Sequence, residues 1–115
     1  MDIEISKELL SEVLGREVTN IEKGCTENEL KIGAYFGVAR QSFHINIDEL
    51  EKRCLRWGWG KGYSFDVIPF CIGVINLETN EEKYFRYEKE DMLNKIPFLS
   101  KYTFKACQWI LDNLK

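Results

Sequence analysis

The spacing of apolar residues alternates along this chain between a helical and an extended period, and no other feature constrains the fold more. Leu10, Val13 and Leu14 recur at the spacing of one helix face. Between residues 41 and 47, apolar side chains instead alternate with polar ones, as in a strand with one buried face. Both periods recur further along. The pattern therefore predicts an α+β fold in which helices pack on an antiparallel sheet.

The predicted elements follow the order α-β-β-β-α-β-β-α within a single domain that spans residues 1–115. We expect helices over residues 7–14, from Asp48 to a stop at Gly62, and from about Ser100 to Leu114. We expect strands over residues 18–23, 30–36, 41–47, 65–77 and 83–87, a turn at Thr79-Asn80, and a short extra helix at about 90–94, before Pro97. Pro69 indicates a bulge or an edge position in the fourth strand.

Length and composition suit one small domain with a core of its own. The chain has 115 residues, 44% of them hydrophobic and 13% aromatic, which is enough apolar surface to oppose disorder. No apolar run approaches the roughly 18 residues that a membrane span needs. The N-terminus also lacks the basic start and apolar core of a signal peptide. We therefore expect a cytoplasmic protein that does not contact the membrane.

The cysteines and the single histidine predict no metal site. Cys25, Cys54, Cys71 and Cys107 are far apart in the sequence, and none belongs to a CxxC pair. Zinc sites usually draw ligands in closely spaced pairs, because two ligands from one turn lower the entropy cost of ordering the site. Free thiols buried in a reducing compartment are the simpler interpretation, and we expect no metal or cofactor.

Acidic side chains flank the second predicted hairpin. Metal-binding carboxylates must converge on one point, and the DxDxDG spacing of a calcium loop is missing. A solvated acidic face is the default interpretation; carboxylates paired around a metal and a surface that imitates nucleic acid are the alternatives. The residues in question are Glu78, Glu81, Glu82, Glu88, Glu90 and Asp91.

Basic and aromatic residues gather in the middle of the chain. The net charge is −3, but residues 31–65 carry six bases and three acids. The segment WGWGKGY at residues 57–63 is not a phosphate loop, because neither GxxxxGK[ST] nor GxGxxG fits it. In the simpler interpretation it is a helix end whose cations complement the helix dipole, with Trp57 packed inward. Alternatively, the stretch forms a surface that stacks a base or holds an acidic partner. The candidate binding residues are Lys52, Arg53, Arg56, Trp59, Lys61 and Tyr63.

His44 is the only residue of the type that most often serves as a general base at neutral pH. Ser42 lies on the same face of the predicted strand but roughly 7 Å away, and Asp48 begins a helix that points elsewhere. No nucleophile elbow or activated cysteine accompanies the histidine in the sequence. We therefore predict an exposed, non-catalytic His44 and no catalytic residue.

Three stretches of the chain carry a recognisable pattern: LLSEVLGREV (residues 9–18), INIDELEKRCLRWGWGKGY (45–63) and FKACQWIL (104–111). Together they resemble small uncharacterised phage and prophage proteins, which carry INIxELxxxCxxWxxxKGY in the middle and FKACxWIL in a C-terminal helix. Here Gly58 stands where alanine is more usual, and the hairpin over residues 65–87 also departs from the pattern. The matching positions are mainly inner-face residues such as Leu50, Cys54 and Cys107. The resemblance implies a phage-type accessory origin in a bacterial host and carries over no catalytic residue.

Three functional hypotheses follow from these observations. We expect first a non-enzymatic binding protein of phage or prophage type, whose partner is a host or phage protein such as a host defence component. The second hypothesis is a nucleic-acid accessory protein that uses residues 52–63, although the acidic balance of the whole chain disfavours it. The third and least favoured is an enzyme centred on His44.

Overall fold

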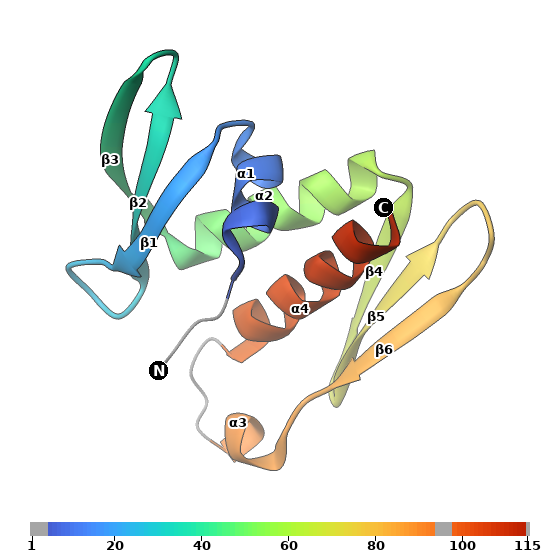
Figure 1. The fold of residues 1–115 in the computed structure, drawn as a ribbon. Helices are drawn as coiled ribbons and strands as arrows, with labels where there is room; N and C mark the ends of the chain where they lie inside the picture. The colour runs from blue at the N-terminus through green and yellow to red at the C-terminus, as the bar shows by residue number, and fades with distance from the viewer. Residues whose placement is uncertain (1–4, 94–97, 115) are drawn as a thin grey trace.

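Figure 1 shows the computed structural model of the protein, which describes residues 5–93 and 98–114. Its elements in chain order are α1 (Lys7–Leu14), β1 (Val18–Lys23), β2 (Glu29–Phe36), β3 (Ala39–Asn46), α2 (Ile47–Gly60), β4 (Tyr63–Ile68), β5 (Cys71–Asn76), β6 (Glu82–Arg86), α3 (Lys89–Leu93) and α4 (Phe98–Asn113). The predicted α+β class is confirmed. None of the described helices has the length and apolar character that crossing a bilayer requires.

The strands form two antiparallel sheets, each with its strands in chain order: β1-β2-β3 and β4-β5-β6. Phe36 pairs with Ala39, so β2 and β3 are joined by two residues only. The first of these, Gly37, has φ 69, a left-handed conformation that such a tight turn needs. In the second sheet, the predicted turn at Thr79-Asn80 leads from β5 into β6. Helices pack on antiparallel strands as predicted, in two sheets.

The predicted strand over residues 65–77 is wrong as a single element. The chain turns at Pro69 and Phe70, and Ile68 pairs with Cys71 across that turn. Proline fixes its φ and has no N–H to donate, so the strand ends here instead of bending. The two halves become β4 and β5, which pair with each other, and the second sheet gains a third strand.

Helices α2 and α4 run in the same direction and pack against each other between the two sheets (Figure 1). The hydroxyl of Thr103 on α4 donates a hydrogen bond of 2.8 Å to the carboxylate of Glu51 on α2. One turn further along, the thiol of Cys107 lies 3.5 Å from the carbonyl oxygen of Cys54. Each sheet is thus followed in the chain by one helix of the central pair, and that pair joins the two halves of the fold.

Two clusters of buried side chains meet at the helix pair. The first lies against β1–β3 and includes Ile32 and Leu50, and the second lies against β4–β6 and includes Ile110. Trp57 and Phe65 are partly buried and pack against both clusters. Trp57 therefore faces inward, as the sequence predicts.

Helix α2 has well-formed ends that position its outer face. The side-chain oxygen of Asn46 accepts hydrogen bonds from the backbone N–H of Asp48 at 2.8 Å and of Glu49 at 3.3 Å. Because Asn46 is the cap, the helix starts at Ile47 and not at the predicted Asp48. After the other end, Gly62 has φ 91, the left-handed conformation predicted for the stop.

The C-terminal helices also follow the prediction closely. Helix α4 begins two residues before the predicted Ser100, and α3 confirms the short helix as far as Leu93. Asn94 and Pro97, which the sequence places at the end of that short helix and beyond it, lie outside the described residues.

Candidate functional site: the outer face of α2

The outer face of α2 carries a line of three exposed side chains. Leu50, Cys54 and Gly58 are buried on the inner face of the helix. On the opposite face, the side chains of Lys52, Arg56 and Trp59 are four and then three residues apart, which aligns them along the helix axis. Trp59 is 59% exposed. We refer to these three residues as the α2 strip; they are Lys52, Arg56 and Trp59.

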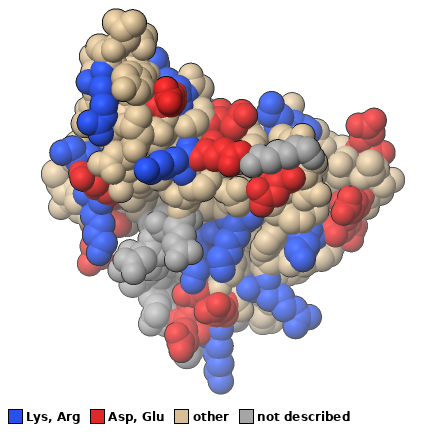
Figure 2. Space-filling model, in the orientation of Figure 1, with Lys and Arg blue, Asp and Glu red and all other residues tan. Residues whose placement is uncertain are grey.

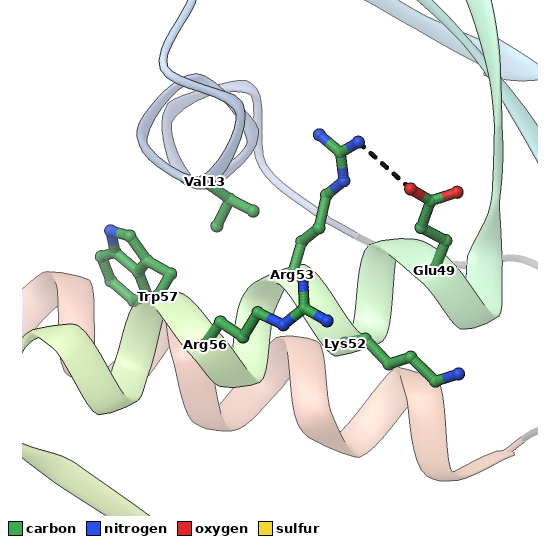
Figure 3. A pocket seen from close by; sticks show the side chains of 6 residues that line it. All are labelled: Val13, Glu49, Lys52, Arg53, Arg56 and Trp57. Atoms are coloured by element: carbon green, nitrogen blue, oxygen red, sulfur yellow. Dashed lines mark hydrogen bonds and ion pairs between the residues drawn. The ribbon is translucent and has the colours of Figure 1, made fainter.

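A hollow of about 470 Å³ adjoins the α2 strip where α1 approaches α2. Its lining residues are Val13, Glu49, Lys52, Arg53, Arg56 and Trp57. Figure 3 shows Val13 of α1 pointing toward α2 between Trp57 and Arg53, while the side chain of Lys52 extends away from them along the helix. The hollow therefore combines an apolar wall with a basic rim.

Arg53 is held by a carboxylate of its own helix. One of its guanidinium nitrogens lies 3.1 Å from the carboxylate oxygen of Glu49, four residues earlier (Figure 3). Both side chains are about half exposed, and an exposed pair of this kind contributes only about 0.3–0.5 kcal/mol. An incoming carboxylate can therefore replace Glu49 at little cost. Lys52 and Arg56 form no ion pair with any side chain in the described part of the chain.

Tyr63 does not belong to this surface. It is the first residue of β4, and its ring is directed toward the helices, where it is only 5% exposed. The ring meets Trp109 edge to face, with ring centres 6.0 Å apart and planes at 85°. The sequence-based proposal that Tyr63 stacks a ligand is therefore wrong, because β4 begins at this residue and its side chain packs in the core cluster of the second sheet.

Lys61 is also separated from the α2 strip. It follows the last residue of the helix and lines a different hollow, of about 530 Å³, together with Tyr63, Asn76 and Leu77. Of the six candidate residues, the structure keeps Lys52, Arg53, Arg56 and Trp59 together and places the other two elsewhere.

The surface charge is mixed. Figure 2 shows lysine and arginine side chains interspersed with aspartate and glutamate over the visible face, without one extended field of a single sign. The net charge of the chain is −3. A long phosphate backbone therefore finds only local basic groups to contact.

The acidic residues near the second sheet form no group of three or more converging carboxylates in the described part of the chain. Asp91 accepts a hydrogen bond of 2.6 Å from the Tyr102 hydroxyl, which holds the pKa of this carboxyl below its ordinary value. Lys101 lies 3.3 Å from the same carboxylate. Glu82 instead accepts a hydrogen bond of 3.0 Å from the Tyr84 hydroxyl. Some of these carboxylates are thus engaged in local structural contacts.

His44 is exposed, as predicted, and among the described residues neither Ser42 nor Asp48 forms a hydrogen bond or an ion pair with it. Its Nδ1 atom lies 3.8 Å from a carboxylate oxygen of Glu29. Cys25 joins these two residues, and the donor atoms of all three lie within 4.8 Å of one another. The sequence does not reveal this cluster, because His44 lies fifteen residues beyond Glu29, although Cys25 and Glu29 are only four residues apart. The register of β2 on β3 brings His44 to Glu29.

Comparison with known proteins adds no family or fold relative: no protein-family model, no curated protein and no solved structure matches this chain.

Proposed function

We propose that this chain is a non-enzymatic accessory protein of phage or prophage type that binds an acidic segment of a host protein on the α2 strip. The observation that carries the proposal is the alignment of Lys52, Arg56 and Trp59 on the face opposite the core, beside a hollow with an apolar wall. The phage-type assignment is supported by the resemblance of residues 45–63 and 104–111, and neighbouring phage genes around the coding sequence would test it.

The chemistry of the surface favours a partner with carboxylates beside an apolar side chain. Arg56 offers a planar fork of N–H donors that matches a carboxylate, and Lys52 adds a second cation one turn away. Trp59 provides a large, rigid contact surface, which is typical of residues that dominate binding energy. A hollow of about 470 Å³ lined by Val13 and Trp57 accepts an apolar side chain of the partner.

The same geometry argues against nucleic acid as the ligand. Single-stranded nucleic acid is held by several aromatic rings on which successive bases stack. With Tyr63 in the core, Trp59 is the one aromatic side chain of the α2 strip. The acidic net charge of the chain also gives no general attraction to a long phosphate backbone.

Site-specific crosslinking tests whether the α2 strip contacts a partner. The photo-crosslinking residue p-benzoylphenylalanine replaces Trp59 in one sample and, as a matched control, Tyr84, which is 47% exposed on the second sheet. The proteins are expressed in a bacterial host and irradiated, and crosslinked proteins are identified by mass spectrometry. We expect a specific protein from position 59 and not from position 84. The same products from both positions, or none from position 59, would contradict the proposal.

Charge reversal then tests the chemistry with the purified partner. Lys52→Glu and Arg56→Glu should each weaken binding by about tenfold or more, since a hydrogen bond to a charged group is worth about 1.5–3 kcal/mol. The matched controls are the single variants Lys61→Glu and Lys83→Glu, each of which changes the net charge by the same amount at an exposed site away from the α2 strip. Equal weakening by the control would show that binding depends on net charge only.

An oligonucleotide titration tests the alternative hypothesis, in which the α2 strip binds nucleic acid. Fluorescence anisotropy with single- and double-stranded oligonucleotides at low salt should show no binding. Binding with a steep salt dependence, lost in Arg53→Ala/Arg56→Ala, would make the nucleic-acid hypothesis correct.

A further inference from the structure

The solvent-facing side of the first sheet brings together three side chains that are typical zinc ligands. They are Cys25 in the β1–β2 loop, Glu29 at the start of β2 and His44 in β3. Their donor atoms all lie within 4.8 Å of one another. His44 is the only histidine of the chain, and Cys25 is its only exposed cysteine, since Cys54, Cys71 and Cys107 are buried.

Backbone structure holds two of these residues side by side. Glu29 pairs with Asn46 and Lys31 pairs with His44, so Glu29 and His44 lie diagonally across two neighbouring strands on one face. The distance of 3.8 Å from the His44 Nδ1 to the Glu29 carboxylate is longer than a hydrogen bond. Two ligands on one tetrahedral zinc ion are about 3.4 Å apart, given bonds of about 2.0–2.2 Å. The two side chains are therefore close to the separation that a shared metal ion requires.

The β1–β2 loop brings Cys25 to the same place. Gly24 donates its backbone N–H to the carbonyl oxygen of Glu29 at 3.0 Å, which closes the loop. A Cβ at Gly24 would lie 2.5 Å from the Glu29 Cβ and 2.8 Å from its carbonyl carbon. Only glycine lets the loop approach Glu29 this closely, and the next residue is Cys25. The backbone of the closed loop therefore holds Cys25 close to Glu29.

We propose that Cys25, Glu29 and His44 bind a zinc ion, with a fourth position open to water or to a side chain of another molecule. Zinc accepts thiolate, imidazole and carboxylate ligands in a tetrahedral arrangement, and sites with three protein ligands keep an open position. A thiolate beside an imidazole favours zinc over the oxygen-seeking ions magnesium and calcium. This site goes beyond the proposed function and lies on a different element from the α2 strip.

The triangular arrangement argues against a cysteine–histidine–glutamate relay. In such a relay the imidazole lies between the other two groups, so the sulfur and the carboxylate oxygen are about 7 Å apart, the ring plus two hydrogen bonds. Here the Cys25 Sγ and the Glu29 carboxylate oxygen are within 4.8 Å of each other. The three donor atoms surround one point, as the ligands of a bound metal ion do.

Titration of the reduced full-length protein with Co²⁺, followed by displacement with Zn²⁺, tests this site. We expect one equivalent of Co²⁺ to produce thiolate charge-transfer absorption in the near ultraviolet and the visible bands of a four-coordinate ion. Cys25→Ser should abolish the charge-transfer absorption. His44→Gln and Glu29→Gln should each weaken Zn²⁺ binding by at least about tenfold, measured by competition with a chromogenic chelator. Glu27→Gln, an exposed glutamate in the same loop but outside the cluster, should leave both readouts unchanged.

Two results would overturn the inference. One is the absence of charge-transfer absorption in the wild-type protein at millimolar Co²⁺. The other is unchanged absorption in Cys25→Ser, which would assign the metal to another thiol. Circular dichroism spectra of each variant confirm that it is folded, and the Zn²⁺-dependent protection of Cys25 from alkylation, mapped by mass spectrometry, gives a second readout. Neither result bears on partner binding at the α2 strip, so the two proposals fail separately.

Discussion

Replacement of Gly58 by alanine tests the packing where the two halves of the fold meet. A Cβ at this position would lie 2.5 Å from Cζ and 2.7 Å from Cε2 of the Phe65 ring, and 3.3 Å from Cδ1 of Ile110. Non-bonded carbon atoms prefer about 3.5–4.0 Å, so the ring must retreat by about 1 Å. It cannot do so by moving its strand, because Phe65 pairs with Val74 in the second sheet.

Two opposing effects determine the stability of Gly58→Ala. Alanine in a helix interior is favoured over glycine by about 1 kcal/mol. Forcing a methyl group into a filled core costs about 1–3 kcal/mol, through strained rotamers and lost contacts. We therefore expect a net loss of about 1 kcal/mol and a fall in Tm of about 4 °C.

A double-mutant cycle with urea denaturation isolates the contact. In Gly58→Ala/Phe65→Leu the ring is gone, so the double variant should be more stable than the sum of the single changes by about 1–2 kcal/mol. Gly60→Ala is the matched control, because a Cβ there meets nothing within 4 Å, and it should stabilise by up to about 1 kcal/mol. The reasoning is refuted if Gly58→Ala is as stabilising as Gly60→Ala, or if the cycle is additive.

Two further predictions concern polar contacts that join α4 to the rest of the fold. Tyr102→Phe removes the hydroxyl that accepts a hydrogen bond of 2.7 Å from the Glu88 backbone N–H, at a cost of about 1 kcal/mol. The same hydroxyl holds the pKa of Asp91 below its ordinary value of 3.8. A lowered carboxyl pKa stabilises the fold at pH values above 3.8, and this contribution is lost as the pH falls. Thermal melts should therefore show a larger loss at pH 7 than at pH 3, and an equal loss at both would contradict this. Burial raises the pKa of Glu51 above its ordinary value of 4.5, although the hydrogen bond from the Thr103 hydroxyl opposes the shift. The folded state therefore favours the protonated carboxyl, and the wild type loses stability as the pH rises through the raised pKa. Urea unfolding should show Glu51→Gln gaining stability relative to the wild type between pH 4.5 and pH 7; a constant difference would show that Glu51 is not desolvated.

Local signals in the sequence predict most of the helices and the first sheet. The serine before α1 accepts a hydrogen bond of 3.0 Å from the Leu9 backbone N–H, and Gly15 after it has φ 68. Such caps depend on one or two neighbouring residues, so they can be read without the fold. The alternation over residues 41–47 likewise predicts β3, because one face of that strand is buried.

The parts that the sequence does not predict depend on register and on distant contacts. The run over residues 65–77 is apolar on both faces, so its period cannot show where the chain reverses; only the pairing of Ile68 with Cys71 does. Tyr63 becomes a core residue because β4 begins there, two residues before the predicted strand. The cluster of Cys25 and His44 requires both the β2–β3 register and the loop closed at Gly24.

The proposed zinc site and the α2 strip lie on consecutive elements, β3 and α2. Backbone and cap hydrogen bonds at the start of α2 fix the helix, and this explains why the two sites can act separately. His44 is two residues before Asn46, whose side chain caps α2. The start of α2 is also fixed by the Ile47 backbone N–H, which donates to the Asn28 carbonyl oxygen at 2.7 Å. These bonds set the direction of the helix without any ion. A metal held by Cys25 would tighten the loop, while the first residue of the α2 strip, Lys52, lies more than one turn beyond the cap. Partner binding and metal binding are therefore expected to be additive, and a chain that lost one would keep the other.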